Sequence, residues 1–327
     1  MRKLKFLLLP ILVIQEIVSM MNPFEILNLS MASSRIKNVV QLYSKHARYF
    51  YRIEFSERPS IDFTGTEDIW RYEITADRNR TEVEDYYQNS MRIMTICVFG
   101  KDILEEVKSW FKYIKEIFNI DGGLMVIINL DTFPGQNKAI TDWVNSQTTW
   151  TRHCDIDGEK VRDDDVKYVL NTLNIRITLN IFANVSDNFR FEVPQFLSQL
   201  YIENGGWIKL NQLLEIDASE IFIRNTKLTR DELTVFFKNW MCMKSQIGLE
   251  CFTAGIEKRD DVDTILDVPH ENFGTETIRT FELKTQEIKL RGGSEIRRCD
   301  GTTAAIFVTT EPDRLVLAMI VVKKKMF

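Results

Sequence analysis

A short apolar run near the start of the chain most constrains how this sequence can fold. The run covers residues 6–14 and follows the basic residues Arg2, Lys3 and Lys5, as in a secretory signal. It is too short to cross a bilayer as a helix, which requires about 20 apolar residues. Residues 15–21 do not have the run of small side chains of a cleavage site, and they repeat apolar side chains at helical spacing. We therefore expect packed helices here, with a cleaved leader of a secreted protein as the alternative.

The segment contains start signals for three short amphipathic helices. Pro10 suits the first turn of the first helix, whose expected apolar stripe comprises Val13, Ile17, Met20 and Met21. The run Asn22-Pro23-Phe24-Glu25 combines an N-cap residue, a proline at the first helical position and a glutamate at N3, which predicts a second helix. A third start is predicted at Ser33 or Ser34. Three such helices bury their apolar sides poorly alone, so either the rest of the chain or a partner protein is expected to cover them.

This segment resembles the F-box motif, beginning with Leu9-Pro10 and extending through Pro23 to Ser30 and Ser33-Ser34-Arg35. The resemblance implies that residues 5–46 form an F-box that docks on a Skp-type adaptor and, through it, on a cullin. Some matching positions would contact the adaptor and others would form the F-box core. The implied adaptor-binding residues are Leu9, Pro10, Val13, Ile17, Met21, Pro23, Ile26 and Leu29.

Charge and cysteine content exclude several other classes of protein. The 327 residues carry 42 Lys and Arg against 47 Asp and Glu, a net charge of -5 with both signs mixed throughout. No basic field draws the molecule to nucleic acid or to a membrane surface, and neither is expected as a partner. The five cysteines form no CxxC pair, which predicts reduced thiols in a cytoplasmic or nuclear protein.

The rest of the chain alternates strand and helix patterns before ending in strands alone. Residues 47–122 are expected to form a β-rich connecting region and a helix, with short hairpins in residues 46–90 and strands at 51–55 and 69–74. Further strands are predicted at 92–99, 124–130, 175–182, 216–223 and 248–252, and helices at 102–118, 136–144, 163–173 and 229–240. Strands at 281–283, 287–290, 294–298, 304–308 and 315–322 follow, with turns at Gly292-Gly293 and Asp300-Gly301. The expected fold is therefore α+β: an N-terminal three-helix segment, then a leucine-rich-repeat-like α/β body closed by antiparallel strands.

The body resembles the type-2 F-box-associated domain of the F-box families expanded in nematodes. One matching segment runs from Trp207-Ile208 through Leu228-Thr229 to Trp240, and the other from Gly292-Gly293 to Ala304. The resemblance implies an F-box-associated domain over residues 123–322, which would bind a target protein of unknown identity. Asn239 and the residues after Trp240 depart from the family pattern, which leaves any shared surface open.

A polar cluster gives the strongest hint of chemistry. His153, Cys154 and Asp155 precede the run Asp163-Asp164-Asp165, which would suit a metal-dependent hydrolase. The spacing of an EF-hand is absent, and acidic residues at this place also suit the first turn of a helix. We therefore expect the run to complement a helix dipole, with no catalytic residue, metal or other cofactor.

Together these features predict a non-enzymatic substrate receptor of a Skp–cullin–F-box ubiquitin ligase. The alternatives are a secreted or non-ligase protein-binding domain, the metal-dependent hydrolase, and a degenerate F-box protein that no longer joins a ligase.

Overall fold

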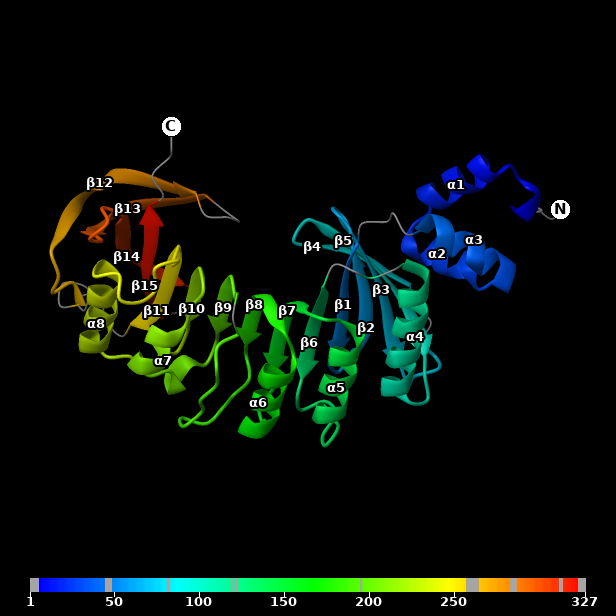
Figure 1. Cartoon of the computed structure of the whole chain (residues 1–327), viewed down its shortest axis with the longest axis horizontal. Coiled ribbons are helices and arrows are strands. Elements are labelled where there is room, and N and C mark those ends of the chain that lie inside the picture. Colours follow the sequence, from blue (N-terminus) through cyan, green and yellow to red (C-terminus); the bar gives the residue numbers. More distant parts are fainter. Residues whose placement is uncertain are drawn as a thin grey trace. The chain divides into compact units, whose positions relative to one another are not determined.

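The computed structural model describes residues 6–44, 49–80, 83–118, 120, 123–194, 196–256, 265–282, 287–311 and 314–322. The chain divides into two compact units, Met1–Thr132 and Phe133–Phe327, and each is built around hydrogen-bonded strands. Figure 1 labels the helices and strands of both units.

The first unit begins with the three predicted helices. After a short 3-10 turn at Phe6–Leu8 come α1 (Ile11–Met20), α2 (Pro23–Ser30) and α3 (Ser34–Ser44). The predicted capping box of α2 is confirmed: the Asn22 side chain accepts from the Glu25 amide at 3.0 Å, and the Glu25 carboxylate accepts from the Asn22 amide at 2.9 Å. Ser33 lies directly before α3, and its Oγ accepts from the Ile36 amide in the first turn of the helix. Residues 45–48, where the F-box is expected to end, lie outside the described residues.

A mixed sheet forms the rest of the first unit. Its strands are β1 (Phe50–Phe55), β2 (Ser60–Thr64), β3 (Asp68–Thr75), β4 (Val83–Gln88), β5 (Met91–Phe99) and β6 (Leu124–Asn129), in the order β6-β1-β2-β3-β5-β4. Helix α4 (Ile103–Phe118) packs on one face through aromatic side chains. The ring of Phe118 lies 5.1 Å from that of Phe63, and Trp110 stacks on Tyr72 at 5.1 Å. The predicted strands and the helix that begins after Asp102 are thus confirmed.

Two of the three N-terminal helices, α2 and α3, are hydrogen-bonded directly to α4. The hydroxyls of Ser30 and Tyr113 lie 2.8 Å apart, and Ser44 donates to the carbonyl of Ile117 at 2.7 Å. The ring of Phe24 meets that of Tyr72 edge-on at 4.9 Å. Within the first unit, the rest of the chain therefore covers part of the apolar surface of these helices.

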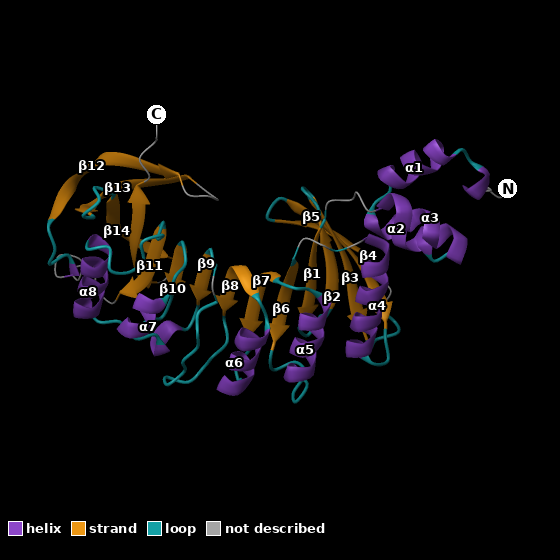
Figure 2. Ribbon diagram, viewed as in Figure 1, coloured by secondary structure: helices purple, strands orange, loops and turns teal. Residues whose placement is uncertain are grey.

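Parallel strands and helices alternate through most of the second unit. Strands β7 (Thr151–Asp157), β8 (Ile175–Ile181), β9 (Gln199–Ile202), β10 (Glu220–Ile223) and β11 (Cys251–Ile256) lie side by side in chain order, each parallel to the next. The helices are α5 (Asn137–Gln147), α6 (Asp163–Thr172), α7 (Leu210–Glu215) and α8 (Arg230–Met241), and Figure 2 shows α6, α7 and α8 gathered on one side of the strands. Alternate side chains of the strands, such as Leu200 and Ile202 of β9, are fully buried. This is the burial pattern of a sheet with one covered face.

Antiparallel strands complete the second unit, as predicted. They are β12 (His270–Glu282), β13 (Glu287–Arg297), β14 (Thr303–Glu311) and β15 (Arg314–Val322), and β15 also pairs with β11. The turn predicted at Gly292-Gly293 is wrong, because both glycines lie inside β13. Their φ values of 70° and 119° belong to an irregular stretch where the register with β12 shifts between Phe273 and Ile278. The sequence patterns also missed β7, β9 and α7.

Candidate functional site

The 3-10 turn and α1 at the start of the chain expose several large apolar side chains. Leu8 is 74% exposed, Leu12 71% and Met20 83%, and smaller fractions of their neighbours are exposed as well. We define the α1 surface as Leu7, Leu8, Ile11, Leu12, Val13 and Met20. Monomeric proteins seldom leave such a group of side chains in water unless a partner covers it.

The opposite side of α1 holds the helix to its neighbours. Ile14 and Val18 are buried together with Phe6, and half-buried side chains from α2 and α3 pack against them. These partners include Leu29 and Val39. One helix thus anchors itself with one side and presents the other to solvent.

The implied adaptor-binding residues divide between these two environments. Pro10 and Val13 are exposed, and Leu9, Ile17, Met21 and Leu29 are half-buried. Pro23 and Ile26 are buried in α2, so their side chains support the fold from within. The expected stripe of α1 does not share one environment, since Val13 and Met20 are exposed while Ile17 and Met21 are half-buried.

Five exposed residues of the α1 surface were not among the expected ones: Leu7, Leu8, Ile11, Leu12 and Met20. A signal for them is present in the sequence, because residues 11–14 are apolar without interruption. A short helix that is apolar on all sides must be covered from more than one direction.

The polar cluster of the second unit is engaged in structural contacts. Asp163 accepts from the Ser186 amide at 2.9 Å and from the Ser186 hydroxyl at 2.6 Å, and these bonds hold the pKa of Asp163 below its ordinary value. Asp165 is ion-paired with Arg162. The Nε2 atom of His153 lies 2.7 Å from the Oδ1 atom of Asp155.

Asp163, Asp164 and Asp165 occupy the first turn of α6, where negative charge favours the helix dipole. Among the described residues, no group of three or more His, Cys, Asp or Glu side chains is placed to hold a metal ion. None of the helices in the described part of the chain has the length and apolar character that a membrane crossing requires.

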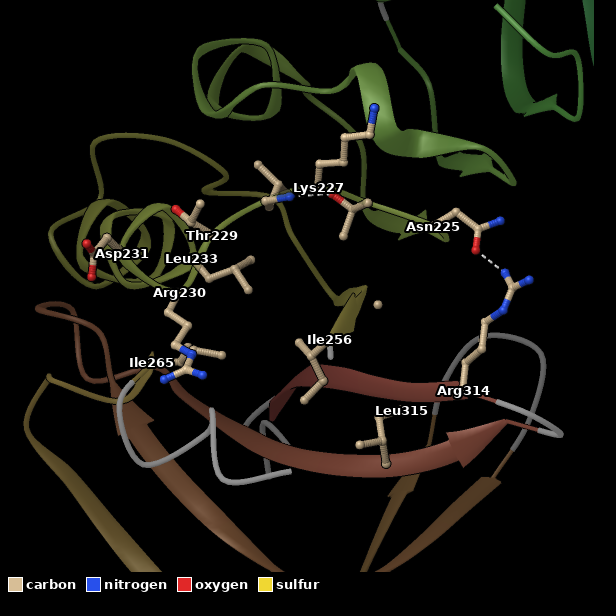
Figure 3. Close-up of a pocket in the computed structure, with 13 residues that line it drawn as sticks. Asn225, Lys227, Thr229, Arg230, Asp231, Leu233, Ile256, Ile265, Arg314 and Leu315 are labelled. Carbon is tan, nitrogen blue, oxygen red and sulfur yellow. Dashed lines mark hydrogen bonds between the residues drawn. The ribbon is translucent and has the colours of Figure 1, made fainter. Parts of the chain in front are cut away.

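The second unit contains a cavity of about 890 Å³ at the carboxyl ends of β10 and β11. Figure 3 shows Lys227, Arg230 and Arg314 around it, with Ile256 and Leu315 between them. Ligands of open α/β sheets commonly bind at this edge, beyond the carboxyl ends of the strands.

Comparisons with known proteins agree with this division of the chain. Residues 6–47 match the F-box domain family, and residues 188–254 match a family described as F-box associated. The chain is also similar to the Skn-1 dependent zygotic transcript 15 protein of Caenorhabditis elegans, with 22% identity over 268 residues, which cover 72% of this chain and 74% of that protein. No solved structure matches.

The α1 surface thus lies in the first of these matched segments, and most of the residues that line the cavity lie in or near the second. The chain therefore carries an F-box domain followed by an F-box-associated domain, and it is a distant homologue of the C. elegans protein.

Proposed function

We propose that this chain is a substrate-receptor subunit of a Skp–cullin–F-box ubiquitin ligase. In this proposal residues 5–46 form the F-box that docks on a Skp-type adaptor, and residues 123–322 form the F-box-associated domain that binds the target protein. Residues 47–122 connect these two parts. The chain itself performs no chemistry, and its place of action is the cytoplasm, the nucleus or both.

The α1 surface carries the proposal. It lies within the segment that matches the F-box domain, and its exposed leucines, isoleucine and methionine would be desolvated by an apolar groove on the adaptor. Because Ile14 and Val18 fix the other side of α1 to the neighbouring helices, the surface is ordered before binding and loses little conformational entropy on docking. Leu9 and Ile17 pack against Phe6, Ile14 and Val18 and are half-buried, and their exposed parts would complete the contact.

The second unit supports the target-binding half of the proposal. Its five parallel strands follow one another in chain order, with intervening helices on one side, and this arrangement resembles the stacking of leucine-rich repeats. Such bodies bind partners through extended surfaces. A target held there would meet a ubiquitin-charged enzyme at high effective concentration, so positioning alone would accelerate transfer.

Co-purification of the full chain with a Skp-type adaptor tests the proposal. We expect the wild-type chain to retain the adaptor and the Leu9→Ala/Pro10→Ala variant to lose it while the body of the chain stays folded. A wild-type chain that retains no adaptor would refute the proposal, as would removal of the N-terminal residues from the endogenous protein as a cleaved leader. Intact peptides from residues 1–24 in its mass spectrum would exclude such cleavage.

A further inference from the structure

Two of the five cysteines are brought together at the surface of the second unit. Cys242 follows the last residue of α8, and Cys299 lies in the turn between β13 and β14. Both carry free, exposed thiols. The Cys299 amide donates to the Met241 carbonyl at 2.9 Å, so this turn is bonded to the peptide group that joins Met241 to Cys242.

This hydrogen bond limits how far apart the two cysteines can be. The Met241 carbonyl oxygen and the Cα atom of Cys242 belong to one planar peptide group, and the Cys299 amide nitrogen is bonded directly to its own Cα atom. With standard backbone dimensions, the two Cα atoms are therefore at most about 7 Å apart. Disulfides usually join Cα atoms about 4.4–6.8 Å apart, so the backbone already holds the pair at the range of a disulfide.

The residues beside the two cysteines indicate which way the thiols point. The guanidinium of Arg298 lies 5.2 Å from the ring centre of Trp240, and both side chains are buried. Two positions along a helix rotate a side chain by about 200°, so Cys242 leaves the end of α8 on the side away from Trp240. Cys299 follows the inward-facing Arg298 and is exposed as well. We therefore place both thiols on the outer side of this contact.

The turn that carries Cys299 is anchored independently of the two thiols. Arg298 donates to the Ile247 carbonyl at 2.8 Å and is ion-paired with Asp300 at 2.8 Å. The turn itself is closed by a bond from the Gly301 amide to the Arg298 carbonyl at 2.9 Å. The two backbones are thus held side by side in the reduced protein, and joining the thiols requires little further ordering.

The other three cysteines are less accessible to an oxidant. Cys154 and Cys251 are buried, and burial raises the pKa of both thiols, that of Cys251 to about 12. Cys97 is half-buried, and its pKa is also raised by burial. Because the thiolate is the form that reacts, oxidation should begin at the exposed pair.

We propose that Cys242 and Cys299 form a redox modification site, which hydrogen peroxide converts into an intramolecular disulfide. One cysteine, as the thiolate, attacks a peroxide oxygen; the O–O bond breaks, a sulfenic acid forms, and the displaced hydroxide takes up the thiol proton as water. The second thiolate attacks the sulfenic sulfur; the S–S bond forms, the S–O bond breaks, and a second water leaves. Two thiols and one peroxide thus give one disulfide and two waters, with two electrons passing from sulfur to oxygen.

The disulfide would tie the end of α8 to the turn between β13 and β14. It would enclose β11, β12 and β13 in a covalent loop, which restricts the unfolded chain far more than the folded one. Disulfides in reducing compartments are usually transient and often sense oxidants, which is the role this position suits. The inference does not depend on the proposed ligase function.

Peptide mass spectrometry of the full-length protein tests the proposal. The chain is treated with one equivalent of hydrogen peroxide at pH 8, blocked with N-ethylmaleimide and digested with trypsin. We expect peptides 239–244 and 299–314 to be joined with the loss of two hydrogen atoms, and to be separated by dithiothreitol. The thermal unfolding midpoint should rise by roughly 5–10 °C on oxidation and fall back on reduction.

Single serine variants provide the matched controls. Cys242→Ser and Cys299→Ser change exposed side chains, so each should keep the unfolding midpoint of the reduced wild type. Neither should give the joined peptides or the reversible rise in midpoint. The remaining cysteine of the pair should instead proceed to the sulfinic acid, because no partner thiol captures its sulfenic acid. Cys97→Ser leaves the pair intact and should behave like the wild type.

Three results would each overturn the proposal. The oxidised wild-type chain could lack the joined peptides, or they could occur only in covalent dimers on a non-reducing gel. The joined peptides could also form without any rise in the unfolding midpoint, which would show that the native backbone does not fit the bond. Adaptor co-purification tests the ligase role separately, so the failure of one proposal is distinguishable from the failure of the other.

Discussion

Replacing Leu8 and Leu12 with serine should sharply weaken adaptor binding without unfolding the chain. Both side chains are about seven-tenths exposed, so neither contributes much to the packing of the N-terminal helices. Complete burial of a leucine side chain is worth about 1.5–3 kcal/mol. If docking buries the exposed part of each, the pair contributes about 2–4 kcal/mol, which corresponds to a roughly 30-fold to 900-fold weaker dissociation constant.

Isothermal titration of a purified Skp-type adaptor into the wild-type and Leu8→Ser/Leu12→Ser chains measures this difference, and circular dichroism gives the unfolding midpoint of each. Ile247→Ser is the matched control, because Ile247 is an exposed aliphatic residue of the second unit. Ile26→Ala is the converse control: its side chain is 2% exposed, so the variant should lose about 2–5 kcal/mol of stability through packing. An affinity of the double variant within twofold of wild type would show that the α1 surface is not the docking surface.

Three further predictions concern packing, charge and thiol reactivity. Gly205→Ala should destabilise the chain by about 1–3 kcal/mol in urea unfolding, because an added Cβ would lie 2.3 Å from the Ile223 side chain. Asp62→Asn should cost about 3–5 kcal/mol in the same assay, since the fully buried Asp62 carboxylate accepts from two arginine side chains that would lose their counter-charge. At pH 8, iodoacetamide should label Cys242 in the native protein far faster than Cys251, because burial raises the pKa of Cys251 to about 12 and keeps its thiol protonated.

Each of these predictions has a control within the chain. Gly248→Ala should change stability by less than about 1 kcal/mol, because nothing lies within 4 Å of the added Cβ. Asp85→Asn, which breaks an exposed pair with Arg92, should have a much smaller effect than Asp62→Asn. The thiol prediction also gives the direction of the pH dependence: the rate of Cys251 labelling should rise as the pH approaches 12 or as urea exposes the side chain. Equal native labelling of the two cysteines at pH 8 would contradict it.

Local signals in the sequence predicted the helix starts well. Capping boxes depend only on residues three positions apart: the one predicted at Asn22 is formed, and the helix predicted at 229–240 begins with another, between Thr229 and Glu232. The long helix α4 was equally readable, since its apolar stripe is regular over four turns.

Features that depend on distant contacts were harder to predict. Helix α1 is apolar on nearly every side, so only its packing against the other helices decides that Ile14 and Val18 point inward. The pair Gly292-Gly293 has the composition of a turn, yet it relieves crowding inside β13, where a Cβ on Gly293 would lie 2.6 Å from the Ile306 carbonyl oxygen. The cavity brings together residues from α8, β11 and β15, which no local pattern connects.

The attachment of α3 to α4 has a consequence for how this chain is assembled from its parts. Gln41 donates to the Glu116 carbonyl at 3.1 Å and Ser44 to the Ile117 carbonyl at 2.7 Å, so α3 satisfies oxygen atoms that the last turn of a helix otherwise leaves to water. The F-box and the sheet that follows it therefore share a helix end as well as a covalent chain. Exchanging these helices for those of another protein would remove the hydrogen bonds between α3 and the end of α4. We therefore expect substitutions at the end of α3 and at the end of α4 to depend on one another.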